Sequence, residues 1–228
     1  MNTQRSARLI RSRYALAVLL VLACAASFGR HHHAKPATGT PGEFDYYVLT
    51  LSWSPSYCLT HPRDHAQCSG KGYGFVLHGL WPQFDAGNWP EFCSSAVTLS
   101  PEAQQLGNTL FPNPKLMEHE WQRHGTCSGL DAVAYFRTAD KALGSVRVPA
   151  EFEAPNSDQS LTGTQIAAAF RKANPSIPAE GLIVACGRGE LTEVRVCLAR
   201  DLVPRSCGTG VRSNCPGAPV DVPATRGH

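Results

Sequence analysis

The spacing of hydrophobic residues changes along the chain, and each pattern predicts a kind of element. Residues 45–53 form a β-branched and aromatic run that predicts a buried strand, which Pro55 ends. A second strand is expected over residues 74–80. Two more are expected over residues 182–186 and 191–198, and the last of these alternates well between apolar and polar positions.

Helical spacing recurs between these strands. Four stretches predict helices: residues 102–110, 117–124, 131–143 and 162–173. Thr162 or Thr164 is expected to cap the last of them. From Pro204 onward glycine and proline dominate, so disulfide bonds must supply the order there. No internal repeat and no second domain boundary is visible in the sequence, which therefore predicts one α+β domain.

The amino-terminal segment predicts an export signal. Four arginines between positions 5 and 13 precede an apolar run over residues 15–26 that ends in small residues. This run is too short for a comfortable membrane span. We therefore expect a signal peptide over residues 1–30, cut near 26–30, and no stable insertion in a membrane.

Lipid attachment is the alternative fate of this segment. Residues 21–24 loosely resemble the cleavage box of bacterial lipoproteins, with Cys24 as the residue that would carry the lipid. Leu22 fits that box poorly, because a small residue is expected near the cut.

Residues 31–43 predict a flexible linker. Three histidines are followed by Ala, Pro, Thr and Gly, and no apolar period is present. The run His31–His33 either binds a metal weakly or is an inert surface triplet.

Removing the predicted signal peptide changes the charge of the chain. The full sequence has a formal net charge of +3, and residues 1–26 contain four arginines and no acidic residue, so the remainder is about −1. A protein that coats RNA or DNA carries an extended basic surface. Any contact with a nucleic acid is therefore expected to be local to one site.

Eight of the nine cysteines lie outside the predicted signal peptide. They are Cys58, Cys68, Cys93, Cys127, Cys186, Cys197, Cys207 and Cys215. An even set in a secreted chain indicates a disulfide framework, and the lack of any Cys-x-x-Cys pair disfavours a zinc ribbon. Eight cysteines allow 105 connectivities, of which we favour Cys58–Cys68, Cys93–Cys127, Cys186–Cys215 and Cys197–Cys207.

Candidate chemistry is concentrated in residues 119–127, His-Glu-Trp-Gln-Arg-His-Gly-Thr-Cys. On a helix with about 100° per residue, Arg123, Glu120 and His124 lie about 40°, 100° and 140° from His119. One helix face would carry a cation, an anion and two imidazoles, which suits acid–base chemistry on a charged substrate. A solvated polar face is the simpler interpretation, and helix geometry alone leaves it open.

A zinc site is the competing interpretation of the same segment. The metalloprotease motif His-Glu-x-x-His places its imidazoles four residues apart, where both can bind one metal ion. His119 and His124 are five residues apart and diverge by about 140° on a helix. The spacing therefore disfavours zinc, and no metal is expected.

Two segments together resemble a known family. Residues 75–82, Phe-Val-Leu-His-Gly-Leu-Trp-Pro, and residues 119–127 resemble the two active-site segments of the ribonuclease T2 family, secreted endoribonucleases with little base specificity. Residues 47–58 are similar to the first strand of its bacterial members, and residues 191–198 match the late cysteine pattern. The resemblance covers residues 44–215.

The resemblance implies a fold and an activity. It implies one disulfide-stabilised catalytic domain over residues 44–216, with a central antiparallel sheet flanked by helices, followed by a disordered tail over residues 217–228. It implies metal-independent cleavage of single-stranded RNA through 2′,3′-cyclic phosphates to 3′-phosphates, by a secreted or periplasmic protein without a cofactor. DNA is not expected to be a substrate, because it lacks the 2′-hydroxyl nucleophile. A monomer is expected.

The resemblance also implies a role for each site residue. His124 would be the general base, His78 the general acid, and His119 a phosphate ligand. Glu120 and Arg123 would stabilise the phosphorane. Substrate binding is expected at Trp81, which either stacks on a base or is a core tryptophan, and at Gln83. Trp89 and Phe84 are weaker stacking candidates. Ser52 stands where many relatives carry a glutamine near the downstream base.

Two positions depart from the family. Arg123 stands where Lys is more frequent, which keeps the charge and changes its reach. Gln83 stands where eukaryotic members frequently have an acid, so the base preference is open. A catalytically weak RNA-binding protein of the same fold is the alternative function. It is disfavoured by the retention of His78, His119, Glu120 and His124.

Overall fold

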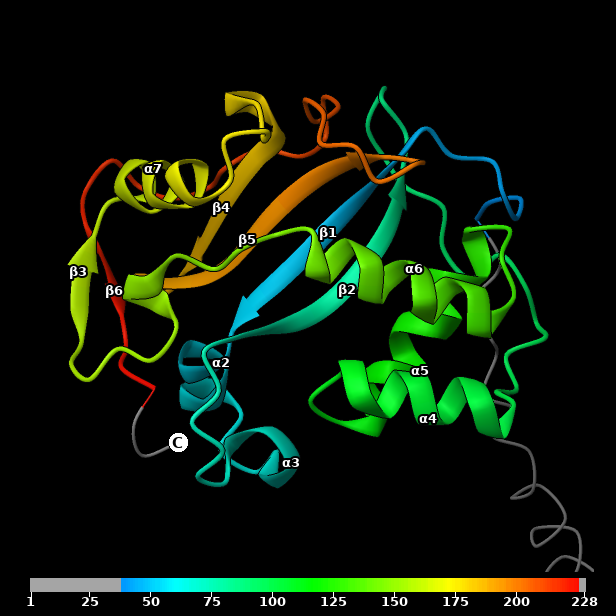
Figure 1. Ribbon diagram of the computed structural model, residues 1–228, viewed down its shortest axis with the longest axis horizontal. Helices are drawn as coiled ribbons and strands as arrows, with labels where there is room; N and C mark the ends of the chain where they lie inside the picture. The colour runs from blue at the N-terminus through cyan, green and yellow to red at the C-terminus, as the bar shows by residue number, and fades with distance from the viewer. Residues whose placement is uncertain (1–37, 226–228) are drawn as a thin grey trace, which may run out of the picture. The chain divides into compact units, whose positions relative to one another are not determined.

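A six-stranded sheet forms the centre of the protein (Figure 1). The computed structural model describes residues 38–225, and the predictions for residues 1–30, for Cys24 and for His31–His33 lie outside them. The strands are β1 (Tyr46–Trp53), β2 (Phe75–Gln83), β3 (Gln159–Leu161), β4 (Leu182–Gly187), β5 (Glu190–Ala199) and β6 (Val220–Val222). Their order is β2-β1-β5-β6-β3, with β4 also paired to β5. All pairs are antiparallel except the short contact between β5 and β6.

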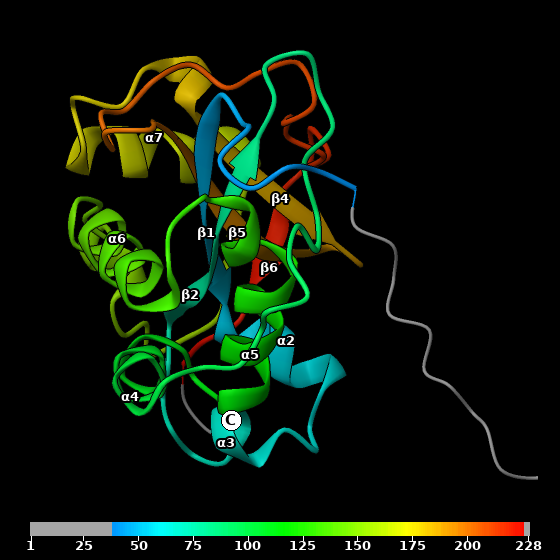
Figure 2. The same ribbon diagram turned by 90° about the vertical axis from the view of Figure 1, so that its right-hand side faces the viewer.

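Helices surround this sheet. They are α2 (Ser54–Thr60), α3 (His65–Cys68), α4 (Pro101–Leu110), α5 (Pro114–Arg123), α6 (Ala132–Gly144) and α7 (Gly163–Ala173), with short 3₁₀ turns at Gly125–Cys127, Ala150–Phe152 and Ala179–Gly181. Figure 2 shows α6 and α7 together on one side of the strands. This arrangement confirms the predicted α+β domain with a mainly antiparallel sheet flanked by helices. No helix within residues 38–225 is long and apolar enough to cross a membrane.

The two faces of the sheet have different surroundings. On β1, Leu49 and Leu51 are buried in the main hydrophobic core, which α6 and α7 cover. Side chains alternate along a strand, so Ser52 points to the opposite face. Ser52 is paired with Glu193 of β5 in the register, which places Glu193 and Arg195 on that opposite face as well. We call it the open face.

A β-bulge in β2 fixes the direction of His78. Gly79 is paired with Thr50 of β1 and Leu77 with Leu51, so the register passes over His78. An extra residue on one strand shifts the alternation of the side chains by one place. Leu77 therefore points into the core, where it is 1% exposed, and His78 lies on the open face.

Helix α5 is held against β2 from its buried side. Trp121 packs on Tyr135 of α6, with ring centroids 5.8 Å apart. The hydroxyl of Tyr135 donates a hydrogen bond of 2.9 Å to the carbonyl of Leu80 in β2. Asn113 caps the start of α5 by accepting a hydrogen bond from the N–H of Leu116 at 2.8 Å. These contacts fix the polar side of α5 relative to the open face.

The four predicted disulfide bonds are all present: Cys58–Cys68, Cys93–Cys127, Cys186–Cys215 and Cys197–Cys207. The second joins the turn after α5 to the loop that follows β2. The loop after β5 carries two of the bonds, as expected for a segment rich in glycine and proline.

Two predicted boundaries at the ends of the domain are wrong. Residues 38–43 were expected to be flexible linker, but the N–H of Gly42 donates to the carbonyl of Cys127 at 2.9 Å and the N–H of Thr38 donates to that of Glu91 at 3.0 Å. Residues 217–225 were expected to be disordered, but β6 pairs with β3 and buries Val220 and Val222. Both segments are ordered by long-range backbone pairing, which the local spacing of hydrophobic residues does not predict.

Helix α5 also differs from its prediction. It ends at Arg123, and His124 follows as its C-cap with φ −116° and ψ −46°. The 3₁₀ turn at Gly125–Cys127 and the disulfide of Cys127 turn the chain there. His119 is exposed whereas His124 is 5% exposed. The helix therefore does not carry both imidazoles on one solvated face.

Candidate active site

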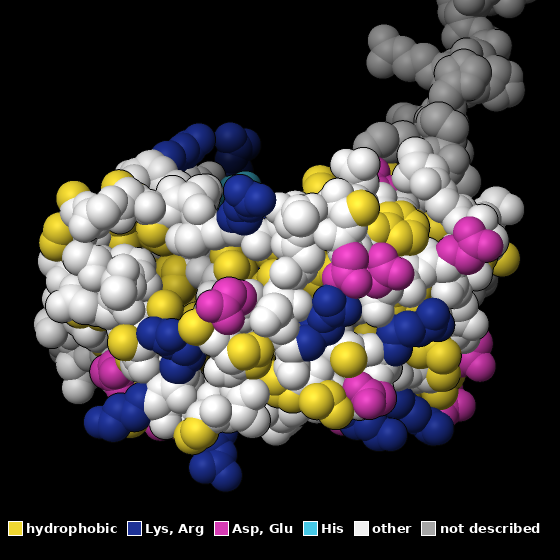
Figure 3. All heavy atoms as spheres, turned by 90° about the horizontal axis from the view of Figure 1, so that it is seen from above, with side chains coloured by type: hydrophobic (Ala, Val, Ile, Leu, Met, Phe, Trp, Pro, Cys, Tyr) yellow, Lys and Arg dark blue, Asp and Glu magenta, His cyan; other side chains and the backbone are white. Residues whose placement is uncertain are grey.

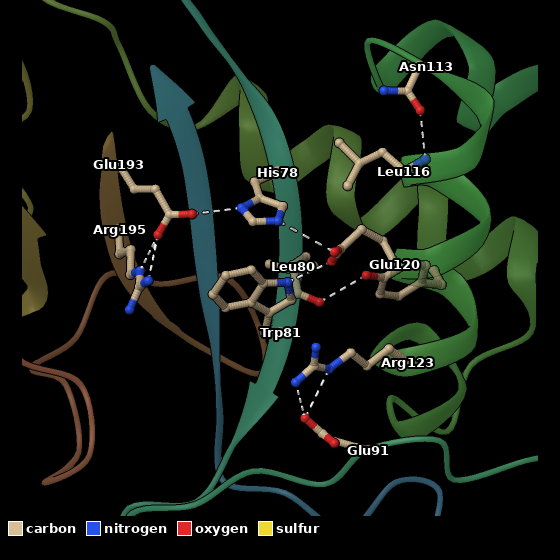
Figure 4. A network of polar contacts seen from close by, with 11 residues as sticks. His78, Leu80, Trp81, Glu91, Asn113, Leu116, Glu120, Arg123, Glu193 and Arg195 are labelled. Atoms are coloured by element: carbon tan, nitrogen blue, oxygen red, sulfur yellow. Dashed lines mark hydrogen bonds and ion pairs between the residues drawn. The ribbon is translucent and has the colours of Figure 1, made fainter. Parts of the chain in front are cut away.

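His78 lies between two carboxylates (Figure 4). Its Nδ1 atom is 2.7 Å from Oε1 of Glu193, and its Nε2 atom is 3.8 Å from Oε1 of Glu120. Arg195 donates from Nε to the other oxygen of Glu193 at 2.8 Å and holds that carboxylate in place. Burial lowers the pKa of His78, but the hydrogen bond to Glu193 and the charges of Glu120 and Glu193 outweigh it, so the pKa is raised overall.

Glu120 is almost fully buried beneath the open face. It is 1% exposed, and its Oε2 atom accepts a hydrogen bond of 2.6 Å from the indole N–H of Trp81. Burial raises the pKa of Glu120 to about 7, although His78, Trp81 and Arg123 each lower it. Near neutral pH this carboxyl group is therefore close to half protonated.

Gly79 permits this close approach of α5 to β2. A Cβ atom at Gly79 would overlap the carboxylate of Glu120 and the indole nitrogen of Trp81. The glycine between His78 and Leu80 is thus required by packing and not by its backbone conformation.

His124, the C-cap of α5, packs against the ring of Trp81. Its ring centroid is 5.2 Å from that of Trp81, while that of His78 is 5.1 Å from it. The Nδ1 atom of His124 is buried and has no hydrogen-bond partner among the described residues. Burial first, and then the positive charge of Arg123, lowers the pKa of His124 to about 3. The imidazole is therefore neutral over the physiological range.

Arg123 is paired with a second buried carboxylate. Its Nε atom donates to Oε1 of Glu91 at 2.9 Å, and a terminal nitrogen of the same guanidinium contacts the same oxygen. Trp89 donates to this oxygen from its indole N–H at 2.7 Å. Glu91 therefore fixes both the guanidinium and the indole at the edge of the site. His119 lies nearby, and burial, then Arg123, lowers its pKa.

All seven predicted catalytic and substrate-binding residues line one cavity of about 260 Å³. They are His78, Trp81, Gln83, His119, Glu120, Arg123 and His124. We call this the Trp81 cavity. Trp81 packs against the small apolar cluster on the open face and not in the main core, which excludes the core interpretation of this residue. Trp89 also lines the cavity, whereas Phe84 packs against the main core.

A second cavity of about 290 Å³ adjoins the first at His78. Ser52, Asn113, Leu116 and Glu193 are among its lining residues, and we call it the Asn113 cavity. His78 lines both cavities. A linear polymer bound across His78 would therefore place one of its monomers in each cavity. Within residues 38–225, no three His, Cys, Asp or Glu side chains are grouped so that they could hold a metal ion.

Three residues that shape the site were missed in the sequence. Glu193 and Arg195 occupy alternate positions of β5 and therefore share a face, but alternation does not say which face. Glu91 lies in a loop, where no hydrophobic pattern applies, and it contacts Arg123, which is 32 residues further along the chain. Only the tertiary structure brings these charges to the two histidines and Arg123.

Comparison with known proteins assigns the chain to a family. The profile of the ribonuclease T2 family matches residues 44–207. The chain belongs to the ribonuclease T2 family. A ribonuclease of Aeromonas hydrophila is 50% identical over 97 residues, which are 42% of this chain and 44% of that protein. The chain likewise spans about half the length of several other curated relatives that it matches.

Solved structures share the fold of this T2 family chain. An RNase-related protein from Calystegia sepium has a TM-score of 0.64 at 24% identity, covering 79% of this chain and 98% of that one. A mutant of RNase MC1, from bitter gourd, in complex with 5′-UMP has a TM-score of 0.57 at 25% identity, covering 77% and 97%.

Proposed function

We propose that the protein is an endoribonuclease that cleaves single-stranded RNA with little base specificity and without a metal ion. The observation that carries the proposal is the pair His78 and His124, which both pack against Trp81 and have pKa values shifted in opposite directions. One imidazole is held ready to give a proton and the other is neutral. Transphosphorylation needs one group of each kind on opposite sides of phosphorus.

His124 is the proposed general base. It takes the proton of the 2′-hydroxyl as that oxygen forms a bond to phosphorus, and the bond from phosphorus to the 5′-oxygen breaks. With a pKa of about 3, His124 is by itself a weak base. A bound phosphate adds negative charge beside the ring, which raises the pKa of His124 toward the working range.

His78 is the proposed general acid. The charged imidazole gives its proton to the departing 5′-oxygen, and the products are a 2′,3′-cyclic phosphate and a 5′-hydroxyl. Glu193 acts as a positioning residue, because its hydrogen bond to Nδ1 holds the ring and favours its charged form. Water then attacks the cyclic phosphate with the two roles exchanged, which leaves a 3′-phosphate.

The negative charge on the phosphorane is stabilised by Glu120, Arg123 and His119. An ionised Glu120 would repel a phosphate, but with a pKa of about 7 the carboxyl group retains a proton below neutral pH and can donate it in a hydrogen bond. Arg123 supplies positive charge, part of which Glu91 offsets. His119 is exposed at the mouth of the cavity and suits a contact with a phosphate oxygen.

The two cavities suit the two nucleosides that flank the cleaved bond. Trp81 offers an aromatic face to the upstream base, and Gln83 offers an amide in the same cavity. The downstream nucleoside, whose 5′-oxygen receives the proton of His78, enters the Asn113 cavity near Ser52. The 5′-UMP complex of an RNase MC1 mutant supports a nucleotide ligand for this fold.

Export to an oxidising compartment completes the proposal. Four disulfide bonds form and persist outside the reducing cytosol, and the arginine-rich leader is typical of a signal peptide. We propose a secreted or periplasmic monomer. Mass spectrometry of the mature protein tests the cut near residues 26–30 against lipid attachment at Cys24.

A short RNA and its all-2′-deoxy counterpart test the proposed activity. The purified protein is incubated with each in the presence of EDTA, and mass spectrometry identifies the new ends. Cleavage of the RNA alone, with 2′,3′-cyclic or 3′-phosphate ends, is expected. Intact RNA at every pH would favour the alternative of a catalytically weak RNA-binding protein, and cleavage that EDTA abolishes would contradict the metal-free reaction.

A further inference from the structure

A groove adjoins the Asn113 cavity at α2, α3 and the start of α5. Residues 57 and 59–66 line it together with residues 113–116, and its volume is about 1020 Å³. Tyr57 and His61 belong to both the groove and the Asn113 cavity, so the two are continuous. We call it the α2–α3 groove. The disulfide Cys58–Cys68 joins its two short helices and gives it a fixed wall.

The α2–α3 groove is positively charged. Arg63 and Lys115 line it, are exposed, and form no ion pair with another described residue. Its one carboxylate, Asp64, accepts hydrogen bonds from the hydroxyl of Tyr57 at 3.0 Å and from Nδ2 of Asn113 at 2.9 Å. The face in Figure 3 differs, because basic and acidic side chains are interspersed there. The carboxylate of Asp64 is already held by two hydrogen bonds. The positive charges of Arg63 and Lys115 can therefore attract a phosphate group.

The α2–α3 groove also offers a flat ring surface. The rings of Tyr57 and His61 are stacked, with centroids 4.2 Å apart and planes 4° from parallel. A hydrogen bond of 2.8 Å between Oγ1 of Thr60 and Nδ1 of His61 fixes the outer ring, which is exposed. Leu59 adds apolar surface at 50% exposure. Stacked aromatic surfaces beside cations are how proteins bind single-stranded nucleic acids without reading the base.

An RNA chain bound at His78 would continue from the Asn113 cavity into this groove. If His78 protonates the 5′-oxygen, the nucleoside downstream of the cut lies in the Asn113 cavity, and its 3′-phosphate leaves that cavity on the side away from Trp81. We infer that the α2–α3 groove binds the second nucleotide downstream of the cleaved bond, with its phosphate at Arg63 and Lys115 and its base against His61. The inference rests on the proposed ribonuclease activity.

Two chimeric substrates isolate this contribution. A dinucleotide of ribouridine and deoxyadenosine, and the trinucleotide with one more deoxyadenosine at its 3′ end, each contain one 2′-hydroxyl and are cleaved at the same bond. Only the trinucleotide reaches the groove. We expect the wild-type kcat/KM to be about 10-fold higher for the trinucleotide, the size of one stacking contact with its phosphate.

The variant R63A/K115A tests the groove directly. It is expected to reduce the trinucleotide advantage to less than about 3-fold and to leave cleavage of the dinucleotide, which does not extend to these residues, unchanged. The control R137A/K141A removes two positive charges from α6, on the other face of the sheet, and should keep the full advantage. The dependence of trinucleotide cleavage on salt should also weaken in R63A/K115A alone.

Failure of the inference and failure of the activity give different results. Three results would overturn the inference and leave the proposed ribonuclease activity intact. The wild-type protein could cleave the two substrates equally well, the trinucleotide advantage could survive in R63A/K115A, or that variant could lose activity equally on both substrates. If the wild-type protein cleaves neither substrate, the proposed function is wrong and the inference is rejected with it.

Discussion

The Nδ1 atom of His78 lies 2.7 Å from Oε1 of Glu193, a residue 115 positions further along the chain. A β-bulge turns His78 onto the open face, and the register of β5 brings Glu193 to the same face. Arg195 holds the carboxylate from its other side. In the proposed mechanism, this contact between β2 and β5 keeps on His78 the proton that the leaving oxygen receives.

Removing the charge of Glu193 tests this contact. Because Glu193 helps to raise the pKa of His78, Glu193→Gln is expected to lower that pKa. His78 would then lose its proton at lower pH, so the alkaline side of the pH profile of kcat/KM moves toward acid. On the acid side the profile falls as pH approaches the His124 value of about 3.

The loss in Glu193→Gln should grow with pH and stay below about 10²-fold, since the general acid itself is retained. Glu180→Gln, at an exposed position outside the site, is the control. A uniform loss at all pH values would mean that Glu193 has only a structural role.

Glu120 should make the stability of the protein depend on pH. Its carboxyl group titrates near 4.5 in the unfolded chain and at about 7 in the folded protein. Between these values the folded state holds a proton that the unfolded state has released, so the free energy of unfolding falls as pH rises from 4.5 to 7. The shift corresponds to about 3 kcal/mol.

The variant Glu120→Gln removes this dependence and keeps an acceptor for the indole of Trp81. The difference in Tm between this variant and the wild type should therefore increase steadily from pH 4.5 to 7, measured by calorimetry. Glu118→Gln, on the exposed side of the same helix, is the control. A difference that is constant across this window would show that burial does not hold the proton on Glu120.

Gly79 tests how closely α5 must approach β2. A methyl group at this position would overlap Glu120 and Trp81, so Gly79→Ala should lower the free energy of unfolding by about 1–3 kcal/mol and reduce activity more than its stability loss explains at a temperature where it is folded. Gly144→Ala is the matched control, because no atom lies within 4 Å of the added carbon. Full activity in Gly79→Ala would contradict the close contact.

The sequence was most informative where local patterns decide the structure. The apolar run of β1 and the threonine cap of α7 were predicted correctly, because each depends on residues close in the chain. Strand β6 was missed, because three residues gain their order only from pairing with β3 and β5. The bulge at His78 was missed for the same reason, since only the partner strand reveals the extra residue.

The site shows the same contrast between local patterns and long-range contacts. The seven predicted residues come from two motifs and line one cavity. The carboxylates that set their protonation and position, Glu193 and Glu91, belong to neither motif and reach the site through β5 and a loop. Residue types at a motif spacing can therefore predict which polar groups share a cavity. The pKa of each group depends on charges that only the fold brings near.

The assignment of His124 as base and His78 as acid is tested most directly with two leaving groups. A dinucleotide needs a proton on its departing 5′-oxygen, whereas uridine 3′-(4-nitrophenyl phosphate) releases a nitrophenolate that needs none. His78→Ala is expected to lower kcat by about 10²–10⁴-fold on the dinucleotide and far less on the ester, while His124→Ala lowers both. Equal losses on the two substrates in His78→Ala, or wild-type turnover in either variant, would contradict the assignment.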